Sequence, residues 1–305
     1  MNFKYSDNNK RYHTLDYYYK HKFNEKVFKI SLNAGFSCPH LHTGGCIYCS
    51  NSGSGEFAGK VEDDLLTQFE QGKQLLHHKW PKGKYIGYFQ ARTNTFAPVS
   101  ILQQKYETIL KLENVIGLSI ATRPDCISDE CLNYLEQLHK KTFLIVELGL
   151  QTIHSQTAKQ INRGHDLECF ENTVKRLRKK NINVIVHIIN GLPYETEKMM
   201  IETVKYLNTL DIQGIKIHML SILKNTKLAE IYETEKFPIL SKEEYIQIVC
   251  KQLQYLKPET VIHRLTSSPK KEDLIEPQWL TKKRSILNDI DKYMAKENIY
   301  QGQKV

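Results

Sequence analysis

Three cysteines, Cys38, Cys46 and Cys49, lie close together in the segment CPHLHTGGCIYCSN (38–51). A single CxxC pair is typical of a redox site and two such pairs are typical of a zinc site, but here one further cysteine lies upstream of a single pair. A cubane iron–sulfur cluster has four irons, each normally held by a cysteine thiolate. Three thiolates would therefore hold such a cluster and leave one iron open to another ligand.

The segment alone leaves two other interpretations open. His40 or His42 would complete a structural zinc site, or the three cysteines are unrelated buried side chains. The other cysteines are scattered and are expected to be small buried residues: Cys126, Cys131, Cys169 and Cys250. The odd total of seven and the uneven spacing argue against a disulfide framework, as expected of a protein in the reducing cytosol.

The overall composition is that of a globular chain with a basic surface. Of its 305 residues, 40% are hydrophobic, which is enough for one large core or two smaller ones. No segment approaches the ~18 apolar residues of a membrane span, and the first sixteen residues contain no apolar signal region. We therefore expect a cytoplasmic protein outside the membrane. The net charge of +9 is compatible with a polyanionic partner but does not specify one.

Residues 1–26 form a basic, tyrosine-rich extension. Tyr12 and the run 17–19 are interspersed with lysines and an arginine, and a helix is predicted from Thr14 to about Phe23. Aromatic rings among cations suit stacking on bases and neutralising phosphates. The alternative is that the rings pack the helix onto the rest of the protein.

From residue 27 to residue 220, apolar runs typical of strands alternate with helical segments. The expected strands are 27–32, 85–90, 117–122, 143–151, 183–191 and 214–220, and the expected helices are 60–78, 100–112, 128–140, 155–179 and 196–209. This alternation predicts parallel strands joined by right-handed crossovers. Near-continuous apolar runs also predict a sheet that is covered on both faces. We therefore expect an α/β protein whose residues 27–220 form an open, six-unit β/α barrel.

Beyond residue 220 the regular alternation ends. Helices are expected at 241–256 and 277–296, with a short strand at 261–265. Residues 221–305 are thus predicted to form a small α+β extension that closes the open side of the barrel. Polar motifs follow the predicted strands at their C-terminal ends, where α/β barrels build their active sites.

Seven segments, in order along about residues 10–280, resemble the radical SAM superfamily and, within it, the YhcC/YtqA-like branch. They are KVFKISLNAGFSCPH, GGCIYCSNSGSGEFAG, YFQARTNTFAP, ATRPDCIS, VELGLQTIHSQTAKQINRGH, HIINGLPYET and KIHMLSILKNTKLA. The ATRPD, VELGLQ and NRGH blocks are also similar to the radical SAM half of the elongator acetyltransferase, which acts on wobble uridine in tRNA. The seven-residue gap between Cys38 and Cys46 is shorter than in relatives, which predicts a tighter loop.

The resemblance implies a [4Fe–4S] cluster on Cys38, Cys46 and Cys49, with S-adenosylmethionine (SAM) chelating the open iron through its amino and carboxylate groups. The residues implied to contact SAM are Tyr48, His187 and Gly191 at the adenine, Gln90 at the amino group, Glu147 and Gln151 at the ribose or amino group, and Arg163 at the carboxylate. A buried Glu147 must have a partner, and a salt bridge to Arg123 is the alternative to SAM.

Three further residues are expected to act on the substrate. Pro124 disfavours helix at Arg123 and turns its guanidinium toward the barrel mouth, where it suits a carboxylate or phosphate. Lys216 and His218 on the sixth strand present a basic edge, with His218 as a proton-transfer group or a core histidine.

The reaction implied by the resemblance begins with one electron from a flavodoxin- or ferredoxin-type donor. It cleaves SAM to methionine and a 5′-deoxyadenosyl radical, which abstracts a substrate hydrogen. The implied substrate is tRNA, and the expected reaction converts 5-carboxymethylaminomethyl(-2-thio)uridine to its 5-aminomethyl form, which a methyltransferase could then finish. Candidate ligands for the substrate carboxylate are Arg123, Arg163, Lys216 and Lys224, and the tyrosine-rich extension and KKRSIL (282–287) would contact phosphates.

Two other functions are compatible with the sequence. A radical SAM enzyme acting on a small metabolite, as in coproporphyrinogen oxidation, predicts no salt-sensitive binding of tRNA. An iron–sulfur or zinc protein that binds RNA without turnover predicts no 5′-deoxyadenosine from reduced protein and SAM.

Overall fold

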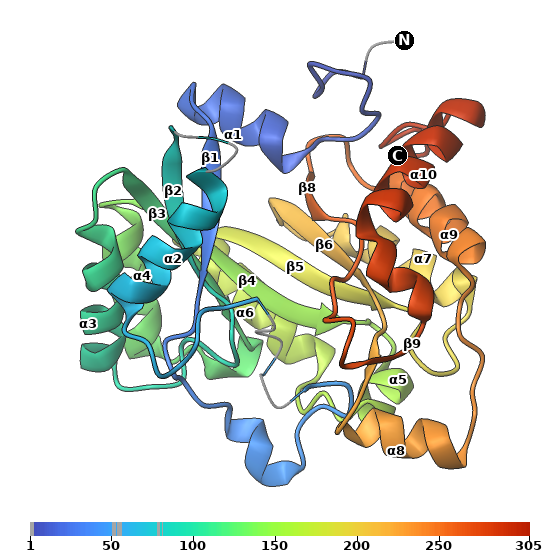
Figure 1. Cartoon of the computed structure of the whole chain (residues 1–305), viewed down its shortest axis with the longest axis horizontal. Helices are drawn as coiled ribbons and strands as arrows, with labels where there is room; N and C mark the ends of the chain where they lie inside the picture. Colours follow the sequence, from blue (N-terminus) through green and yellow to red (C-terminus); the bar gives the residue numbers. More distant parts are fainter. Residues whose placement is uncertain (1–2, 51–52, 54–56, 78–79, 81) are drawn as a thin grey trace.

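The protein is built on a curled, fully parallel sheet of seven strands (Figure 1). The structure, a computed structural model, describes residues 3–50, 53, 57–77, 80 and 82–305. Along the sheet the strands are β1 (Val27–Leu32), β2 (Lys84–Phe89), β3 (Val115–Thr122), β4 (Phe143–Gln151), β5 (Asn183–Asn190), β6 (Gly214–Met219) and β8 (Val261–Arg264). The first six match the predicted runs, which confirms the open β/α barrel. The short strand predicted in the extension pairs in parallel with β6 and makes a seventh strand.

Helices connect successive strands and cover the outer face of the sheet (Figure 1). They are α2 (Leu65–His77), α3 (Val99–Leu110), α4 (Asp129–His139), α5 (Ser155–Gln160), α6 (Leu167–Lys179) and α7 (Glu197–Leu207). The single helix predicted at 155–179 is wrong: it is interrupted at 161–166. Asn162 and Gly164 take left-handed φ angles of 50° and 79° there, which an α-helix does not accommodate.

Side chains alternate between the two faces of the sheet because successive residues of a strand point in opposite directions. On β4, Leu144, Val146 and Leu148 lie in the hydrophobic core under the helices, whereas Glu147 lines the inner cavity. The same alternation places His187 of β5 inside the barrel. The apolar half of each strand therefore holds the fold together, and the polar half faces the interior.

Helix α1 (Leu15–Phe23) spans the N-terminal end of the barrel. The side chain of Thr14 accepts a hydrogen bond from the backbone N–H of Tyr17 and caps the helix where the sequence predicts it to begin. The helix contacts both β1 and β8, the two edges of the sheet, and Ile262 N–H donates to the carbonyl of His13 at 2.8 Å. Tyr12 and Tyr19 are buried, so their rings pack on the barrel rather than offering a surface for bases.

The remaining elements are three 3-10 turns, two short strands and three further helices of the described chain. They are η1 (Pro39–Thr43), η2 (Pro124–Cys126), β7 (Ile222–Leu223), α8 (Lys227–Thr234), α9 (Lys242–Tyr255), β9 (Leu274–Glu276), η3 (Gln278–Lys282) and α10 (Lys283–Lys296). Strands β7 and β9 form a separate antiparallel pair, and helices α9 and α10 pack together. Among the described residues, no helix is long and apolar enough to span a membrane.

Candidate active site

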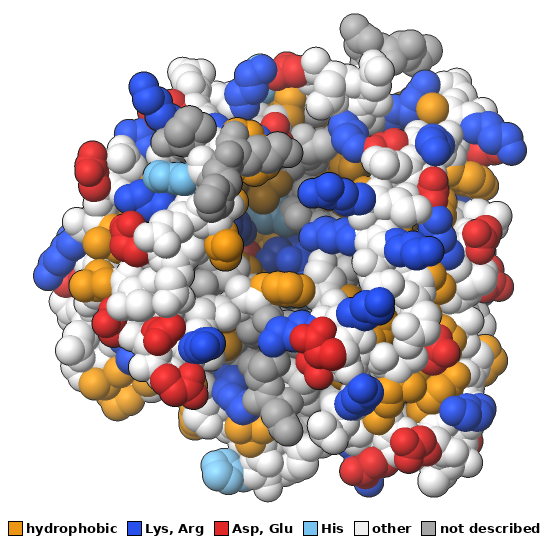
Figure 2. Space-filling model, in the orientation of Figure 1, with side chains coloured by type: hydrophobic (Ala, Val, Ile, Leu, Met, Phe, Trp, Pro, Cys, Tyr) orange, Lys and Arg blue, Asp and Glu red, His pale blue; other side chains and the backbone are white. Residues whose placement is uncertain are grey.

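A cavity of about 480 Å³ opens at the C-terminal ends of the strands and reaches down to Leu15 of α1. Figure 2 shows this hollow near the centre of the molecule, with lysine, arginine and histidine side chains inside it. Apart from Gly191 and Lys224, the site residues predicted from the sequence line it: Cys38, Cys46, Tyr48, Cys49, Gln90, Arg123, Glu147, Gln151, Arg163, His187, Lys216 and His218.

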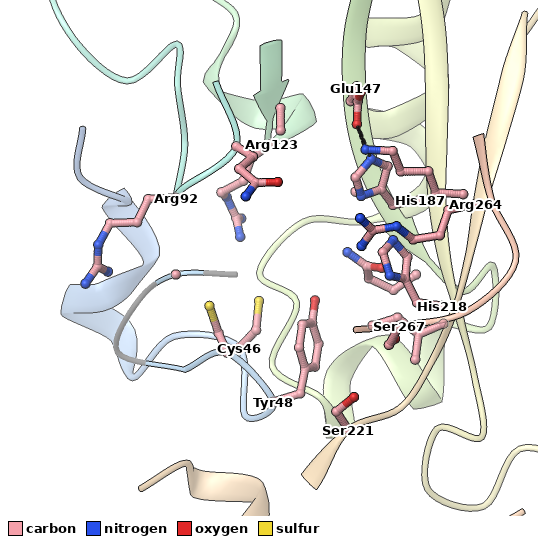
Figure 3. A pocket seen from close by; sticks show the side chains of 18 of the residues that line it. Cys46, Tyr48, Arg92, Arg123, Glu147, His187, His218, Ser221, Arg264 and Ser267 are labelled. Carbon is pink, nitrogen blue, oxygen red and sulfur yellow. Dashed lines mark hydrogen bonds and ion pairs between the residues drawn. The ribbon is translucent and has the colours of Figure 1, made fainter. Parts of the chain in front are cut away.

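The cysteine loop (38–49) follows β1 and packs on residues 161–166, the segment that separates α5 from α6. A 3-10 turn begins directly after Cys38, and Gly44 and Gly45 then take left-handed φ angles of 89° and 68° that allow the chain to reverse. The side-chain amide of Asn162 donates to the carbonyl of Gly45 at 2.7 Å. These contacts bring the cysteines to one side of the cavity, as Figure 3 shows for Cys46.

The donor set of this loop fits a cluster better than a zinc ion. Both ring nitrogens of His40 are engaged within the chain, Nε2 with the carbonyl of Asn162 and Nδ1 with the Thr43 hydroxyl, each at 2.5 Å. His42 is exposed.

The thiols also lie beside positive charge, which favours the thiolate form that an iron–sulfur cluster requires. Burial raises the pKa of the Cys46 thiol above its ordinary value, and the hydroxyl of Tyr48 and the charges of Arg123 and Arg163 offset part of that rise. Three cysteines on the wall of a polar cavity therefore suit a cluster with one open iron.

Both arginines predicted to hold a carboxylate are engaged with the chain itself. Arg123 forms a two-point ion pair with Asp125, at 2.9 and 2.8 Å, and donates to the carbonyl of Arg163 at 2.9 Å. Arg163 is buried and donates to three carbonyls, those of Leu150, Thr152 and His165. These bonds fix the segment beneath the cysteine loop.

Glu147 is the centre of the opposite wall. Its Oε1 accepts from Lys29 at 2.8 Å and Ser119 at 2.6 Å; its Oε2 accepts from His187 at 2.7 Å and from Lys216. A carboxylate offers about four acceptor positions, so this one is satisfied by the chain. The salt bridge to Arg123 that the sequence offered as an alternative is wrong, because the cationic partners are Lys29 and Lys216.

Burial shifts the ionisation of the groups around this carboxylate. It lowers the pKa of Lys216 to about 7, against the opposing charge of Glu147. Burial and the charge of Lys216 lower the pKa of His187 to about 4. Burial and His187 also hold the pKa of His218 well below its usual range. The two imidazoles are therefore neutral at pH 7, and their rings lie 5.2 Å apart.

Two predicted residues lie elsewhere. Gly191 is outside the cavity lining; its φ is 78°, and a Cβ there would come within 2.9 Å of the Met219 side chain. The absence of a side chain thus serves packing and backbone conformation. Lys224 is exposed and donates to the carbonyl of Glu272 at 2.6 Å, also outside the lining.

Four further lining residues were not predicted from the sequence: Lys29, Tyr88 and, from β8, His263 and Arg264. Lys29 interrupts the apolar run VFKISL at a position facing inward, which was a readable signal. Tyr88 accepts a hydrogen bond from Lys216 at 2.8 Å, but an aromatic ring is common in a strand and gave no signal of this role. Four buried atoms of residues that line this cavity lack a partner among the described residues: Gln151 Oε1, His218 Nε2, His263 Nδ1 and Ser268 Oγ. Such atoms suit contact with a bound molecule.

Comparisons with known proteins agree with this geometry. Residues 37–207 match the Radical SAM superfamily, and residues 212–296 match the Radical_SAM C-terminal domain. The chain is 49% identical to the uncharacterized protein YtqA of Bacillus subtilis (strain 168), covering 99% of this chain and 95% of YtqA. It is 30% identical to protein YhcC of Escherichia coli (strain K12), covering 91% of this chain and 90% of YhcC.

Two further similarities are more distant. The tRNA uridine(34) acetyltransferase of Methanocaldococcus infernus is 28% identical over 44% of this chain and 25% of its own length. The solved structure of Methanocaldococcus infernus Elp3 with an N-terminal deletion has a TM-score of 0.69 at 17% identity. It covers 90% of this chain, which in turn spans 64% of the Elp3 chain. At this identity, the similarity to the solved Elp3 structure concerns the fold alone.

The predicted resemblance is thus confirmed over nearly the whole chain. An open parallel barrel, a three-cysteine loop at its mouth and a polar cavity beside that loop meet the needs of a [4Fe–4S] cluster and SAM. The chain belongs to the radical SAM superfamily, whose enzymes use a [4Fe–4S] cluster and SAM.

Proposed function

We propose that this radical SAM enzyme modifies a wobble uridine of tRNA, removing the carboxymethyl group from 5-carboxymethylaminomethyl(-2-thio)uridine. The observation that carries the proposal is the composition of the cavity wall facing the cysteines. There Lys29, Lys216 and Arg264 accompany Glu147, the one carboxylate among the described residues that line the cavity. An excess of buried positive charge suits a substrate that brings an anionic group into the cavity.

The bound cluster and SAM would supply a 5′-deoxyadenosyl radical by one-electron reduction. In the substrate, the methylene between the amine and the carboxylate would give up a hydrogen atom, because the resulting radical is stabilised by both neighbours. Loss of one electron to a one-electron acceptor gives a protonated imine, which becomes the neutral imine when its N–H proton leaves. Water then hydrolyses the imine to the 5-aminomethyl base and glyoxylate, so that atoms and electrons balance.

The chain's own residues would position the substrate and handle the protons. Cys38, Cys46 and Cys49 would hold the cluster, and Tyr48, Gln90 and Gln151, which line the same cavity, would contact SAM. Lys216, whose pKa is lowered to about 7, suits a proton-transfer role in imine hydrolysis at neutral pH. Helix α1 closes the other end of the barrel and limits the access of water.

Two observations support tRNA as the partner. The similarity to a tRNA uridine(34) acetyltransferase points to the same class of substrate. Beside the hollow, Figure 2 shows lysine and arginine side chains gathered over the C-terminal segment. Exposed cations of this segment are Lys270, Lys271, Lys282, Lys283 and Arg284. A basic rim next to the cavity would hold phosphates while a base enters.

The test uses anaerobically reconstituted protein with SAM, dithionite and bulk tRNA from a strain that lacks this gene. We expect 5′-deoxyadenosine formation to be stimulated by this tRNA, and nucleoside mass spectrometry to show loss of the carboxymethyl group. Formation of 5′-deoxyadenosine without any change in the tRNA would refute the tRNA proposal and direct the search to small metabolites.

A further inference from the structure

We propose that Arg264 forms a subsite for the substrate's carboxylate, on the cavity wall that faces the cysteines. The proposal rests on the proposed conversion of the carboxymethylaminomethyl group and names the residue that recognises it. Arg264 lines the cavity, and no described residue forms a hydrogen bond or ion pair with its guanidinium. A partly buried arginine without a partner is costly unless a ligand supplies the anion.

The other cationic side chains of the cavity are engaged with the chain. Lys29 and Lys216 bind Glu147, and Arg123 pairs with Asp125. Arg163 donates to backbone carbonyls, and Arg92 also has interactions within the chain. A carboxylate that enters the cavity can therefore bind the guanidinium of Arg264 without displacing a hydrogen bond to another described residue.

The backbone of β8 explains why Arg264 faces the cavity. Ile262 pairs with Ile215 and Arg264 with Lys216, so the register skips His263. Such a bulge re-aims side chains, and here the consecutive residues His263 and Arg264 both line the cavity. In Figure 3 the Arg264 side chain extends from its strand toward the middle of the pocket, next to His187 and His218.

The neighbours of Arg264 complete a site of the right chemistry. Nε2 of His218 and Oγ of Ser268 are buried without a partner among the described residues, and both residues line the same cavity. A guanidinium can bind a carboxylate through two parallel N–H donors, while an imidazole or a hydroxyl donates a further bond. Figure 3 also shows Arg264 across the pocket from Cys46, one of the cysteines that would hold the cluster.

The first experiment compares the reconstituted wild-type holoenzyme with Arg264→Gln, Arg264→Lys and a control, Lys140→Gln. Lys140 is exposed and lies just before β4, at the end of the barrel opposite the mouth. The dissociation constant is measured for two tRNAs, one with the carboxymethylaminomethyl group and one with the aminomethyl group. We expect Arg264→Gln to weaken binding of the first by about 10- to 100-fold, the cost of removing a charge-assisted pair. Binding of the second should change less than twofold, and Arg264→Lys should lie between.

Two results would overturn the proposal. Equal weakening for both tRNAs would mean that Arg264 contacts a group common to them. A shift in the SAM concentration dependence of 5′-deoxyadenosine formation, with unchanged tRNA discrimination, would assign Arg264 to the carboxylate of SAM.

A second measurement separates this proposal from the proposed function. Phenylglyoxal labels accessible arginines, and peptide mass spectrometry reports the labelling of Arg264 in the holoenzyme. N-methylglycine, which carries the same carboxymethylamine group, should protect Arg264 in a concentration-dependent way, even if the wild-type enzyme leaves every tRNA unchanged. Absence of protection at any concentration would refute the subsite, whereas protection without tRNA turnover would refute only the tRNA assignment.

Discussion

At Glu147 of β4, one carboxylate receives hydrogen bonds from side chains of β1, β3, β5 and β6. Replacing it by glutamine keeps the shape but leaves Lys29 and Lys216 without a buried counter-charge. Breaking a buried ion pair in this way costs about 3–5 kcal/mol. We expect Glu147→Gln to lower the free energy of unfolding by that amount in anaerobic urea titrations. The double variant Glu147→Gln/Lys216→Met should recover part of the loss, and a single variant as stable as wild type would contradict this role.

The neutral imidazole of His187 makes stability depend on pH. Its pKa is lowered to about 4 in the folded protein, against about 6.5 in an unfolded chain. Between these values the unfolded state binds more protons, so stability is fully present above pH 6.5 and is lost as the pH falls toward 4.

His187→Gln removes this titration while keeping an N–H donor for Glu147. In the same pH window, its free energy of unfolding should fall less steeply than that of wild type, by up to about 1.4 kcal/mol per pH unit. Chemical denaturation at a series of pH values measures the two slopes. Parallel slopes would mean that His187 is protonated in the folded state.

For individual residues, the sequence predicted which side chains line the cavity better than it predicted their hydrogen-bond and ion-pair partners. The cysteines, Gln90 and Lys216 could be placed because they follow or lie on recognisable strands. The true partner of Glu147 depends on how far the sheet curls, which brings Lys29 of β1 across the barrel to β4. The inward direction of the Arg264 side chain could not be predicted, because it depends on a bulge in β8 that the hydrophobic pattern of the sequence does not indicate.

Among the elements, α1 closes the barrel, and Tyr19 is its main anchor. The ring packs with Val27 and Ile86 and forms an edge contact with Phe143 at 6.3 Å. Removing a buried aromatic ring costs about 3–5 kcal/mol, so Tyr19→Ala should destabilise the protein by that amount in urea unfolding.

Tyr19→Phe is the matched control for this prediction. The Tyr19 hydroxyl is buried and has no hydrogen-bond partner among the described residues. Since an unsatisfied buried polar group costs about 1–3 kcal/mol, the phenylalanine variant should be as stable as wild type or more so. A loss of stability on removing the hydroxyl would reveal a partner for it.

Element positions were largely predictable from the sequence, because the six long strands are strongly apolar and the helices between them are amphipathic. Thr14 marked the start of α1 correctly. The extension was harder: β8 is only four residues long, and its place beside β6 depends on pairing between segments far apart in the chain rather than on local pattern. The basic, aromatic composition of residues 1–26 was compatible with packing or with RNA contact until the burial of Tyr12 and Tyr19 was known.

For the molecule as a whole, the two ends of the barrel differ in what they offer a nucleic acid. The mouth carries the cavity and the basic rim, while the other end is closed by α1. If tRNA approaches the mouth, charges on the rim should govern its affinity. We expect Lys282→Gln/Arg284→Gln to weaken tRNA binding and to reduce the slope of log K against log salt by about one for each phosphate that the variant no longer neutralises.

The matched control is Lys140→Gln/Lys141→Gln, which removes two exposed charges at the closed end. Both double variants change the net charge by the same amount, so a general electrostatic attraction would affect them equally. Fluorescence anisotropy with labelled tRNA at several salt concentrations separates the cases. Because the rim lies beside the cavity and the control pair lies across the molecule, weaker binding confined to the rim variant would mean that the base enters from the mouth. Equal slopes for the two variants would instead mean that the positive charge attracts tRNA without orienting it.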